Sequence, residues 1–346
     1  MGGTFAGVDL RAVEAWMVRT GLGKGPIAKV EPLLGGTQNV MARIVHDGRE
    51  FVLRRGPLHP RAGSNASILR EQRVLRALAR TAVPHPRWIA GCDDPEILDG
   101  SVFYLMEPID GFNAGVELPA PFADDSALRH RMGLGIVDAL AELGAVDHVE
   151  VGLADFGKPE GFLERQVPRW RRELESYRSL GGGDGLPGVE EVGRWLEAKQ
   201  PAKYVPGIMH GDYHSANVLF SRESPNVAAI IDWEMCTIGA PLLDLGWLLA
   251  TWRLPGAPGV FGGPFLRSDG LATPGELTER YAGRSSRDLS DLPWYTVLAC
   301  YKLAIILEGT DARARAGLAD PKTGAELHTT ALLLVDRAHA LMNGES

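Results

Sequence analysis

Alternating apolar and polar positions in the first third of the chain predict a small antiparallel sheet. A two-residue period over several short segments is typical of half-buried strands, and Asp47-Gly48 supplies the turn of a hairpin. One segment between the strands has the period of a helix, with Ile68 and Leu75 on its apolar face. The predicted strands are residues 28–33, 40–45, 50–55 and 101–106, and the predicted helix is residues 67–80.

Beyond residue 124 the apolar positions mostly recur at helical spacing, which predicts a large and mainly helical second part. One pair of short apolar segments interrupts this pattern and predicts strands at residues 217–220 and 227–232. The predicted helices are residues 127–143, 161–177, 189–199, 242–252, 273–281, 293–307 and 324–342. The sequence therefore predicts an α+β fold. A small antiparallel-sheet lobe with one key helix is expected at residues 1–106, a hinge at 107–111, and a larger, mostly helical lobe at 112–346.

The composition indicates a globular protein with a moderate negative charge. The 346 residues are 45% hydrophobic and carry a net charge of −8, which allows two packed units and makes a nucleic-acid partner unexpected. Three widely separated cysteines (Cys92, Cys236 and Cys300) lack metal-ligand spacing and suggest a reducing compartment. Asp244 and Lys302 interrupt long apolar stretches, and the first residues lack the pattern of a signal peptide. We therefore expect a cytoplasmic protein with no membrane partner.

The third predicted strand places an aliphatic side chain and a cation on one face. Strand alternation directs Val52 and Arg54 to the side opposite Phe51 and Leu53. Glu71 lies on the apolar stripe of the following helix, where an unpaired buried charge would be costly. Arg54 is its expected partner. The alternative is that Glu71 lies at the edge of the stripe, in water.

The segment LLGGTQN joins the first two strands and contains a candidate phosphate-binding turn. Gly35, Gly36 and Thr37 would let the backbone approach a ligand and direct amide groups at phosphate. An ordinary hairpin turn is the alternative, since no lysine-serine or lysine-threonine pair follows as in a Walker loop.

The segment HGDYHSANVLF carries the densest polar chemistry of the chain. Asp212 and Asn217 are five residues apart, the separation used when one carboxylate meets an acceptor hydroxyl and a nearby amide oxygen holds a cation. Asp232 ends the following apolar strand and could supply another oxygen ligand to Mg²⁺. A transition-metal site formed by His210, Asp212 and His214, or a polar turn that caps a helix, are alternatives. Neither accounts for Asp232, so the order of the motifs favours phosphoryl transfer.

These motifs resemble the aminoglycoside phosphotransferase family, which is related to choline kinases and more distantly to protein kinases. The resemblance rests on HGDYHSANVLF, IIDWE and GAPLLDLGWLL, and it extends from about Glu31 to Glu308. The segments GGTQNVMARIV, FVLRR, REQRVLRAL and FYLMEPIDG are most similar to the branch whose domains occur fused to, or encoded beside, acyl-CoA dehydrogenases. The resemblance implies a protein-kinase-like fold of two lobes.

The resemblance also implies roles for the polar residues. Asp212 would orient or deprotonate the acceptor hydroxyl, while Asn217 and Asp232 would hold Mg²⁺ on the phosphates of ATP, or of GTP in its place. Arg54 stands where most of the family has a lysine, contacting the phosphates and pairing with Glu71; arginine keeps the charge but differs in reach and geometry.

Further positions follow from the same resemblance. The backbone from Glu107 to Ile109 would bind the adenine edge, with Val52 against the nucleotide. Asp244 would brace the catalytic loop that His210 begins, although a cap at the start of its helix also fits its position. Trp233 and Glu234 replace the phenylalanine and glycine of the protein-kinase metal motif, so a protein substrate is not expected.

The expected acceptor is a small hydroxylated molecule. An arginine cluster that includes Arg169 could receive an acidic substrate, with an ion-paired and solvated helix face as the alternative. Tyr301 and Glu308 share a helix face that could line the pocket or pack in the core. The resemblance suggests a hydroxyacyl-CoA or hydroxy acid as the acceptor of an ATP-dependent O-phosphotransferase. A nucleotide-binding pseudokinase that acts as a regulatory module is the alternative function.

Overall fold

The chain forms two compact units in a computed structural model that describes residues 4–5, 7–33, 39–57, 63–180, 185–253 and 263–344. The first unit comprises Met1–Asp110 and Ala229–Glu234, and the second comprises Gly111–Ala228 and Met235–Ser346. An antiparallel sheet characterises the first unit and helices the second, which confirms the predicted α+β class.

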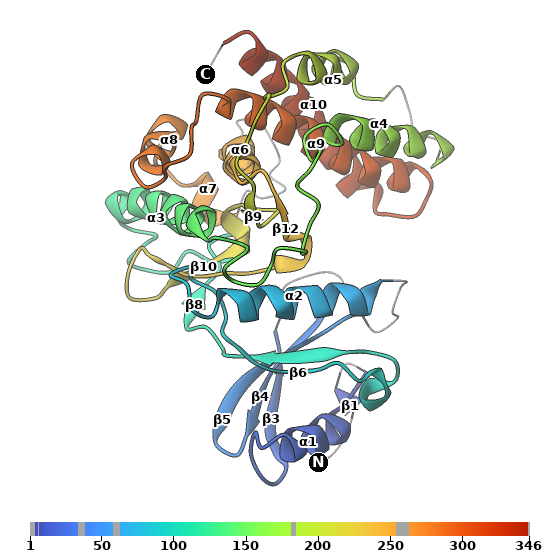
Figure 1. Ribbon diagram of the computed structural model, residues 1–346, viewed down its shortest axis with the longest axis vertical. Coiled ribbons are helices and arrows are strands. Elements are labelled where there is room, and N and C mark those ends of the chain that lie inside the picture. Colours follow the sequence, from blue (N-terminus) through green and yellow to red (C-terminus); the bar gives the residue numbers. More distant parts are fainter. Residues whose placement is uncertain are drawn as a thin grey trace. The chain divides into compact units, whose positions relative to one another are not determined.

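The first unit is built on a five-stranded antiparallel sheet with the order β3-β4-β5-β7-β6 (Figure 1). Asp47 and Gly48, with φ angles of 50° and 72°, form the expected turn between β4 and β5. The strands are β1 Thr4–Phe5, β2 Val8–Asp9, β3 Ile27–Pro32, β4 Val40–His46, β5 Arg49–Arg55, β6 Trp88–Cys92 and β7 Phe103–Met106; the helices are α1 Leu10–Arg19 and α2 Ser64–Leu78, with a 3₁₀ turn at Pro95–Leu98.

Helix α1, which the sequence analysis did not predict, covers one face of this sheet. Its residues Val13, Trp16 and Met17 are buried with Phe51 and Leu53 of β5 in one apolar core. The Asp9 side chain caps the helix by accepting hydrogen bonds from two backbone N–H groups of its first turn. Strand alternation leaves the opposite face of β5 for α2.

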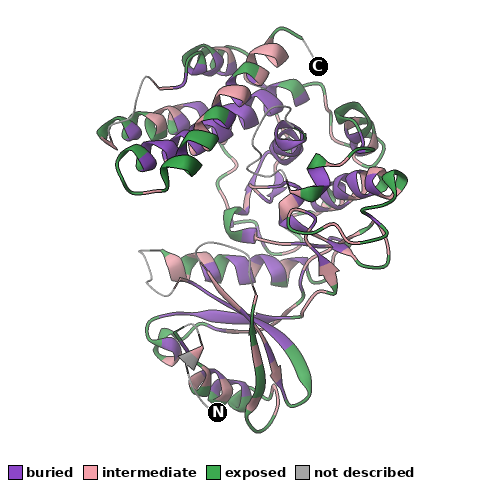
Figure 2. Cartoon of the chain, turned by 180° about the vertical axis from the view of Figure 1, so that it is seen from behind, coloured by how far each residue is buried: buried purple, intermediate pink, exposed green. Residues whose placement is uncertain are grey.

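The second unit is mainly helical and surrounds a fully buried helix. All ten residues of α6, Leu242–Thr251, are buried (Figure 2). The other helices are α3 Ser126–Ala145, α4 Gln166–Ser176, α5 Val189–Ala198, α7 Pro264–Arg267, α8 Pro274–Ala282, α9 Leu292–Arg315 and α10 Pro321–Met342. The strands are β8 Gly111–Phe112, β9 Gly207–Met209, β10 Val218–Ser221 and β12 Thr237–Gly239, and short 3₁₀ turns lie at Tyr177–Leu180 and Ser215–Asn217. Strand β11 Val227–Ile230 and the 3₁₀ turn Trp233–Met235 each have residues in both units.

Several predicted helix boundaries differ from the structure, most of all at α4 and α9. Helix α4 begins at Gln166 rather than at residue 161, because Gly161 has a left-handed φ of 63° and Pro168 fits only in the first turn of a helix. Helix α9 continues past residue 307 to Arg315 even though it contains Gly309, where a Cβ atom would lie only 2.6 Å from the ring of Tyr177. Within the described part of the chain, every helix is too short or too polar to cross a membrane.

Candidate active site

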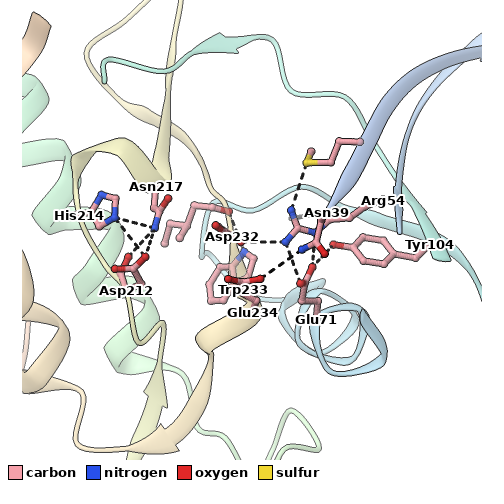
Figure 3. Close-up of polar contacts among 12 residues, drawn as sticks. Asn39, Arg54, Glu71, Tyr104, Asp212, His214, Asn217, Asp232, Trp233 and Glu234 are labelled. Carbon is pink, nitrogen blue, oxygen red and sulfur yellow. Dashed lines mark hydrogen bonds and ion pairs between the residues drawn. The ribbon is translucent and has the colours of Figure 1, made fainter. Parts of the chain in front are cut away.

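A buried ion pair links strand β5 to helix α2 in the first unit (Figure 3). The Arg54 guanidinium donates from Nε to Glu71 Oε2 at 2.6 Å and from Nη2 to Oε1 at 3.0 Å. Glu71 is 1% exposed, so the alternative that places it in water was wrong, and the predicted partner is confirmed. The hydroxyl of Tyr104 on β7 also donates to Glu71 at 3.0 Å. Burial opposes the positive charge, but Glu71 raises the pKa of Arg54 above its ordinary value.

Asp232 follows β11 and belongs to the same unit as Arg54. Its backbone has a φ of 66°, a left-handed conformation that costs a residue other than glycine about 1–2 kcal/mol. Its Oδ1 atom accepts a hydrogen bond from Arg54 Nη2 at 3.0 Å, and its side chain is 36% exposed. The unfavourable backbone conformation thus places a carboxylate beside a buried cation, with part of that carboxylate open to solvent.

The catalytic-loop candidates lie together in the second unit, between β9 and β10 (Figure 3). The Asn217 amide nitrogen donates to the backbone oxygen of Asp212 at 2.9 Å and to its Oδ2 atom at 3.1 Å. His214 Nδ1 accepts the backbone N–H of Ala216, and its Nε2 atom lies 3.2 Å from the Asn217 amide nitrogen and 3.5 Å from Asp212 Oδ2. Burial raises the pKa of Asp212, but His214 and nearby positive charges lower it to about 2. Asp212 is therefore a carboxylate across the physiological pH range.

Asp244 holds the start of this loop, as the resemblance implied. Its carboxylate accepts the backbone N–H groups of His210 at 2.6 Å and Gly211 at 2.9 Å, so the side chain is not a helix cap. Gly211 has a φ of 87°, and a Cβ atom there would lie 2.5 Å from the carbonyl oxygen of Met235. Only glycine fits this position without displacing backbone.

Lys302 on α9 contacts the same glycine and was not recognised as a site residue in the sequence. Its Nζ atom donates to the carbonyl oxygen of Gly211 at 3.1 Å and lies 4.3 Å from the ring centre of Trp247 and 5.6 Å from that of Trp170. Burial lowers the pKa of Lys302 to about 8, although Asp212 and Asp244 partly oppose this shift. The backbone of Gly211 is therefore held by a buried anion at its N–H and by a buried cation at its carbonyl.

We predict that Lys302→Met lowers the rate of the reaction at this site by about 10- to 100-fold. Losing the contact to Gly211 would misplace the neighbouring Asp212, and a small misplacement of a reacting group has effects of this size. The folded-state pKa of about 8 lies below the ordinary 10.5. Between these two pKa values the unfolded chain binds more protons than the folded chain, so the free energy of unfolding rises with pH. The activity is expected to fall over the same range, because Lys302 loses its positive charge in the folded state. Rate and urea-denaturation profiles from pH 7 to 10.5 would test this, with the exposed Lys199→Met as control. Identical pH–rate profiles for Lys302→Met and the parent would contradict it.

The remaining nucleotide-binding candidates are placed only in part. Gly35, Gly36 and Thr37 lie outside the described residues. Val52 is 5% exposed on β5, on the same face as Arg54. The Glu107 N–H donates to the carbonyl of Arg87 at 2.9 Å, which leaves the Glu107 carbonyl as the candidate contact to an adenine, together with Ile109.

The substrate candidates differ in exposure. Arg169 is exposed, with its guanidinium 5.1 Å from the ring centre of Trp170. Tyr301 is 2% exposed and Glu308 4% exposed, and the Glu308 carboxylate contacts His328. Arg171 of the arginine cluster pairs with Glu190 and Glu197 of α5, as an ion-paired helix face would. A substrate role for these three candidates stays a prediction.

The transition-metal alternative does not fit the described side chains. Those of His210, Asp212 and His214 are not a group whose ligand atoms converge on one point. His214 instead bonds to the Ala216 N–H, and the His210 ring packs edge-on against Tyr213 at 5.8 Å between ring centres.

The donor set does fit a hard cation such as Mg²⁺. Because the Asn217 amide nitrogen faces Asp212, its amide oxygen is turned away from that carboxylate (Figure 3). Such oxygens, together with carboxylates like that of Asp232, are the ligands Mg²⁺ prefers.

A family model described as the phosphotransferase enzyme family matches residues 29–280, more than half of the chain. Acyl-CoA dehydrogenase family member 10 of Mus musculus is 27% identical over 283 residues, which are 80% of this chain and 26% of that protein. Acyl-CoA dehydrogenase family member 11 of Gallus gallus is 28% identical over 301 residues, which are 84% of this chain and 37% of that protein. The chain thus spans well under half the length of these relatives.

Solved structures share the fold along nearly the whole chain. A Ralstonia eutropha protein provisionally assigned as an aminoglycoside phosphotransferase is 28% identical with a TM-score of 0.80, covering 96% of this chain and 98% of that one. The aminoglycoside phosphotransferase APH(4)-Ia, solved with AMP-PNP and hygromycin B, is 15% identical with a TM-score of 0.60, covering 95% and 99%. These likenesses confirm the predicted kinase-like fold.

Proposed function

Because the chain belongs to the phosphotransferase enzyme family, we propose that it transfers the γ-phosphate of MgATP to a hydroxyl group of a small molecule. The observation that carries the proposal is the contact between Asp212 and Asn217. The amide nitrogen of Asn217 fixes the Asp212 carboxylate, whose pKa of about 2 keeps it anionic. An anionic carboxylate beside an outward-facing amide oxygen suits an acceptor hydroxyl and a metal-bound phosphate.

Each residue has a defined task in this reaction. Asp212 accepts the hydrogen bond of the acceptor hydroxyl and directs its oxygen at the phosphorus atom. Asn217 and Asp232 would provide oxygen ligands for Mg²⁺, which would neutralise charge on the phosphates. Arg54, held by Glu71, faces the phosphate oxygens. Arg54 and Asp232 belong to the first unit, and Asp212 and Asn217 belong to the second.

We propose a hydroxyacyl-CoA or a hydroxy acid as the acceptor. Both curated relatives are named as acyl-CoA dehydrogenase family members, which supports an acyl substrate. The exposed guanidinium of Arg169 offers a contact for a carboxylate or phosphate group of such a molecule.

A nucleotide-binding regulatory module is the second candidate. The ion pair between Arg54 and Asp232 favours it, because it engages one oxygen of the carboxylate that would hold the metal. Such a module would bind nucleotide without turning it over.

We expect label from γ-labelled ATP and Mg²⁺ to enter one of four pools: hydroxyacyl-CoAs, free hydroxy acids, choline-like alcohols or aminoglycosides. Asp232→Ala is expected to abolish transfer, because it removes a metal ligand from the phosphates. Asp336→Asn, a change at an exposed position of α10, is the control and should retain transfer.

The outcomes separate the two functions. Label in one pool, lost in Asp232→Ala, identifies the acceptor class. ATP binding with no transfer and no slow ATP hydrolysis favours the regulatory module. A chain that binds neither ATP nor GTP would contradict both functions.

A further inference from the structure

Three metal-ligating side chains meet in the second unit, between the two longest helices. Glu308 and Asp311 lie three residues apart on α9, and His328 lies on α10. One ligand atom from each lies within 4.8 Å of the others. Glu308 is 4% exposed and Asp311 5%, whereas the His328 side chain is 25% exposed. The group is thus buried on one side and open to solvent on the other.

The two carboxylates are incompletely balanced by their neighbours. Glu308 Oε2 lies 2.6 Å from His328 Nδ1, a contact that neutralises charge only if the ring is protonated. Asp311 Oδ2 lies 2.6 Å from Arg315 Nε. Even so, this buried oxygen accepts no hydrogen bond from the part of the chain that the structure describes. Two buried carboxylates therefore share one permanent cation, and the contact of Asp311 Oδ2 with Arg315 is an ion pair without hydrogen-bond geometry.

We infer that Glu308, Asp311 and His328 bind a first-row divalent metal ion such as Zn²⁺. Two carboxylates and one imidazole are a donor set of such ions, and the exposed side of His328 leaves room for a water ligand. Ligand atoms at about 2.0–2.1 Å from a tetrahedral zinc ion are about 3.3 Å apart. The pair of Glu308 Oε2 and His328 Nδ1 would only have to widen slightly from its 2.6 Å separation.

This inference does not rest on the proposed phosphate transfer, and it assigns Glu308 to a metal in place of the substrate role predicted for it above. Its imidazole ligand makes the site chemically distinct from a magnesium site. A bound ion would tie α9 to α10, which residues 316–320 connect along the chain. Zinc is therefore expected to raise the melting temperature of the full chain, since the three ligands come together only in the folded state.

Titration of the full chain with Zn²⁺ by calorimetry tests the site. His328→Ala is expected to lose one equivalent of bound zinc, or to bind it at least about 100-fold more weakly, because even outer partners of a metal site contribute about 10- to 100-fold. The matched control is His339→Ala on the same helix, which should keep the parent stoichiometry. Equal stoichiometry and affinity in His328→Ala and the parent would overturn the inference.

Arg315→Gln separates a metal site from a simple ion-pair network. Without the guanidinium the carboxylates should bind zinc roughly tenfold more tightly, because one repelling charge beside the ion is removed. If the carboxylates serve only Arg315 and His328, the variant gains no zinc affinity. An unchanged affinity would remove Asp311 from the ligand set and overturn the three-ligand assignment.

Discussion

Replacing Asp212 with asparagine is expected to slow phosphoryl transfer by about 10²- to 10⁴-fold, the usual contribution of a positioned acid–base group. The fold should persist, because the asparagine oxygen can still accept the Asn217 amide hydrogen bond that Asp212 now accepts at 3.1 Å. What is lost is the negative charge that holds the acceptor hydroxyl toward the phosphate. The measurement is the transfer rate from γ-labelled ATP at saturating nucleotide, once an acceptor is identified.

The low pKa of Asp212 predicts how this carboxylate acts. With a pKa of about 2 it is a weak proton acceptor, so we expect it to orient the hydroxyl and to receive its proton only after the phosphorus–oxygen bond has begun to form. The pH–rate profile of the parent should therefore have no step near pH 4 due to Asp212. In that range the profile of Asp212→Asn should have the same shape as that of the parent. Because the pKa is lowered in the folded state, Asp212 stabilises the fold above its ordinary pKa of 3.8, and this contribution is lost as pH falls toward 2.

The control for Asp212→Asn is Asp336→Asn, the same substitution on the exposed face of α10. A transfer rate of Asp212→Asn within a factor of about two of the control would exclude Asp212 as the catalytic carboxylate. Because loss of this stabilising carboxylate itself lowers the melting temperature, the rates are compared at a temperature where both variants are fully folded. A loss of rate that disappears under those conditions would point to a structural role.

Much of the first unit is predictable from sequence because its signals are local. Alternation along β5 separates Phe51 and Leu53, which pack under α1, from Arg54, which faces α2. The helical stripe that holds Glu71 then leaves Arg54 as its expected partner, and the structure confirms the pair. Asp47-Gly48 is equally local, since few dipeptides accept two positive φ angles.

The contacts that join distant segments are not predictable in this way. Lys302 reads as a charge that interrupts an apolar helix, and nothing in its neighbourhood indicates that its ammonium reaches Gly211, 91 residues earlier. His328 and Glu308 likewise lie on different helices and meet only because α9 and α10 pack together. Such pairs depend on how helices cross, and a single sequence carries no periodic signal for that geometry.

Substituting methionine for Glu71 is expected to destabilise the first unit by about 3–5 kcal/mol, because it leaves the Arg54 guanidinium buried without its main counter-ion. Arg54→Met should cost a similar amount, since Glu71 would then be a buried carboxylate with only the Tyr104 hydroxyl as donor among its known partners. Methionine retains most of the volume of either side chain, so cavity formation contributes little. Hydrogen exchange in β5 and α2 with increasing urea reports the stability of this unit alone.

The double substitution distinguishes a pair that stabilises the fold from one that serves function. Without both charges the Tyr104 hydroxyl loses its acceptor and the partly exposed Asp232 carboxylate loses its ion pair, so the double variant should lose about 1–3 kcal/mol, less than either single variant. Its ATP affinity should not recover, because Arg54 is absent. The exposed Arg80→Met is the matched control and should change neither property. A loss in the double variant equal to the sum of the single losses would contradict this coupling, and restored ATP binding would exclude Arg54 from the nucleotide site.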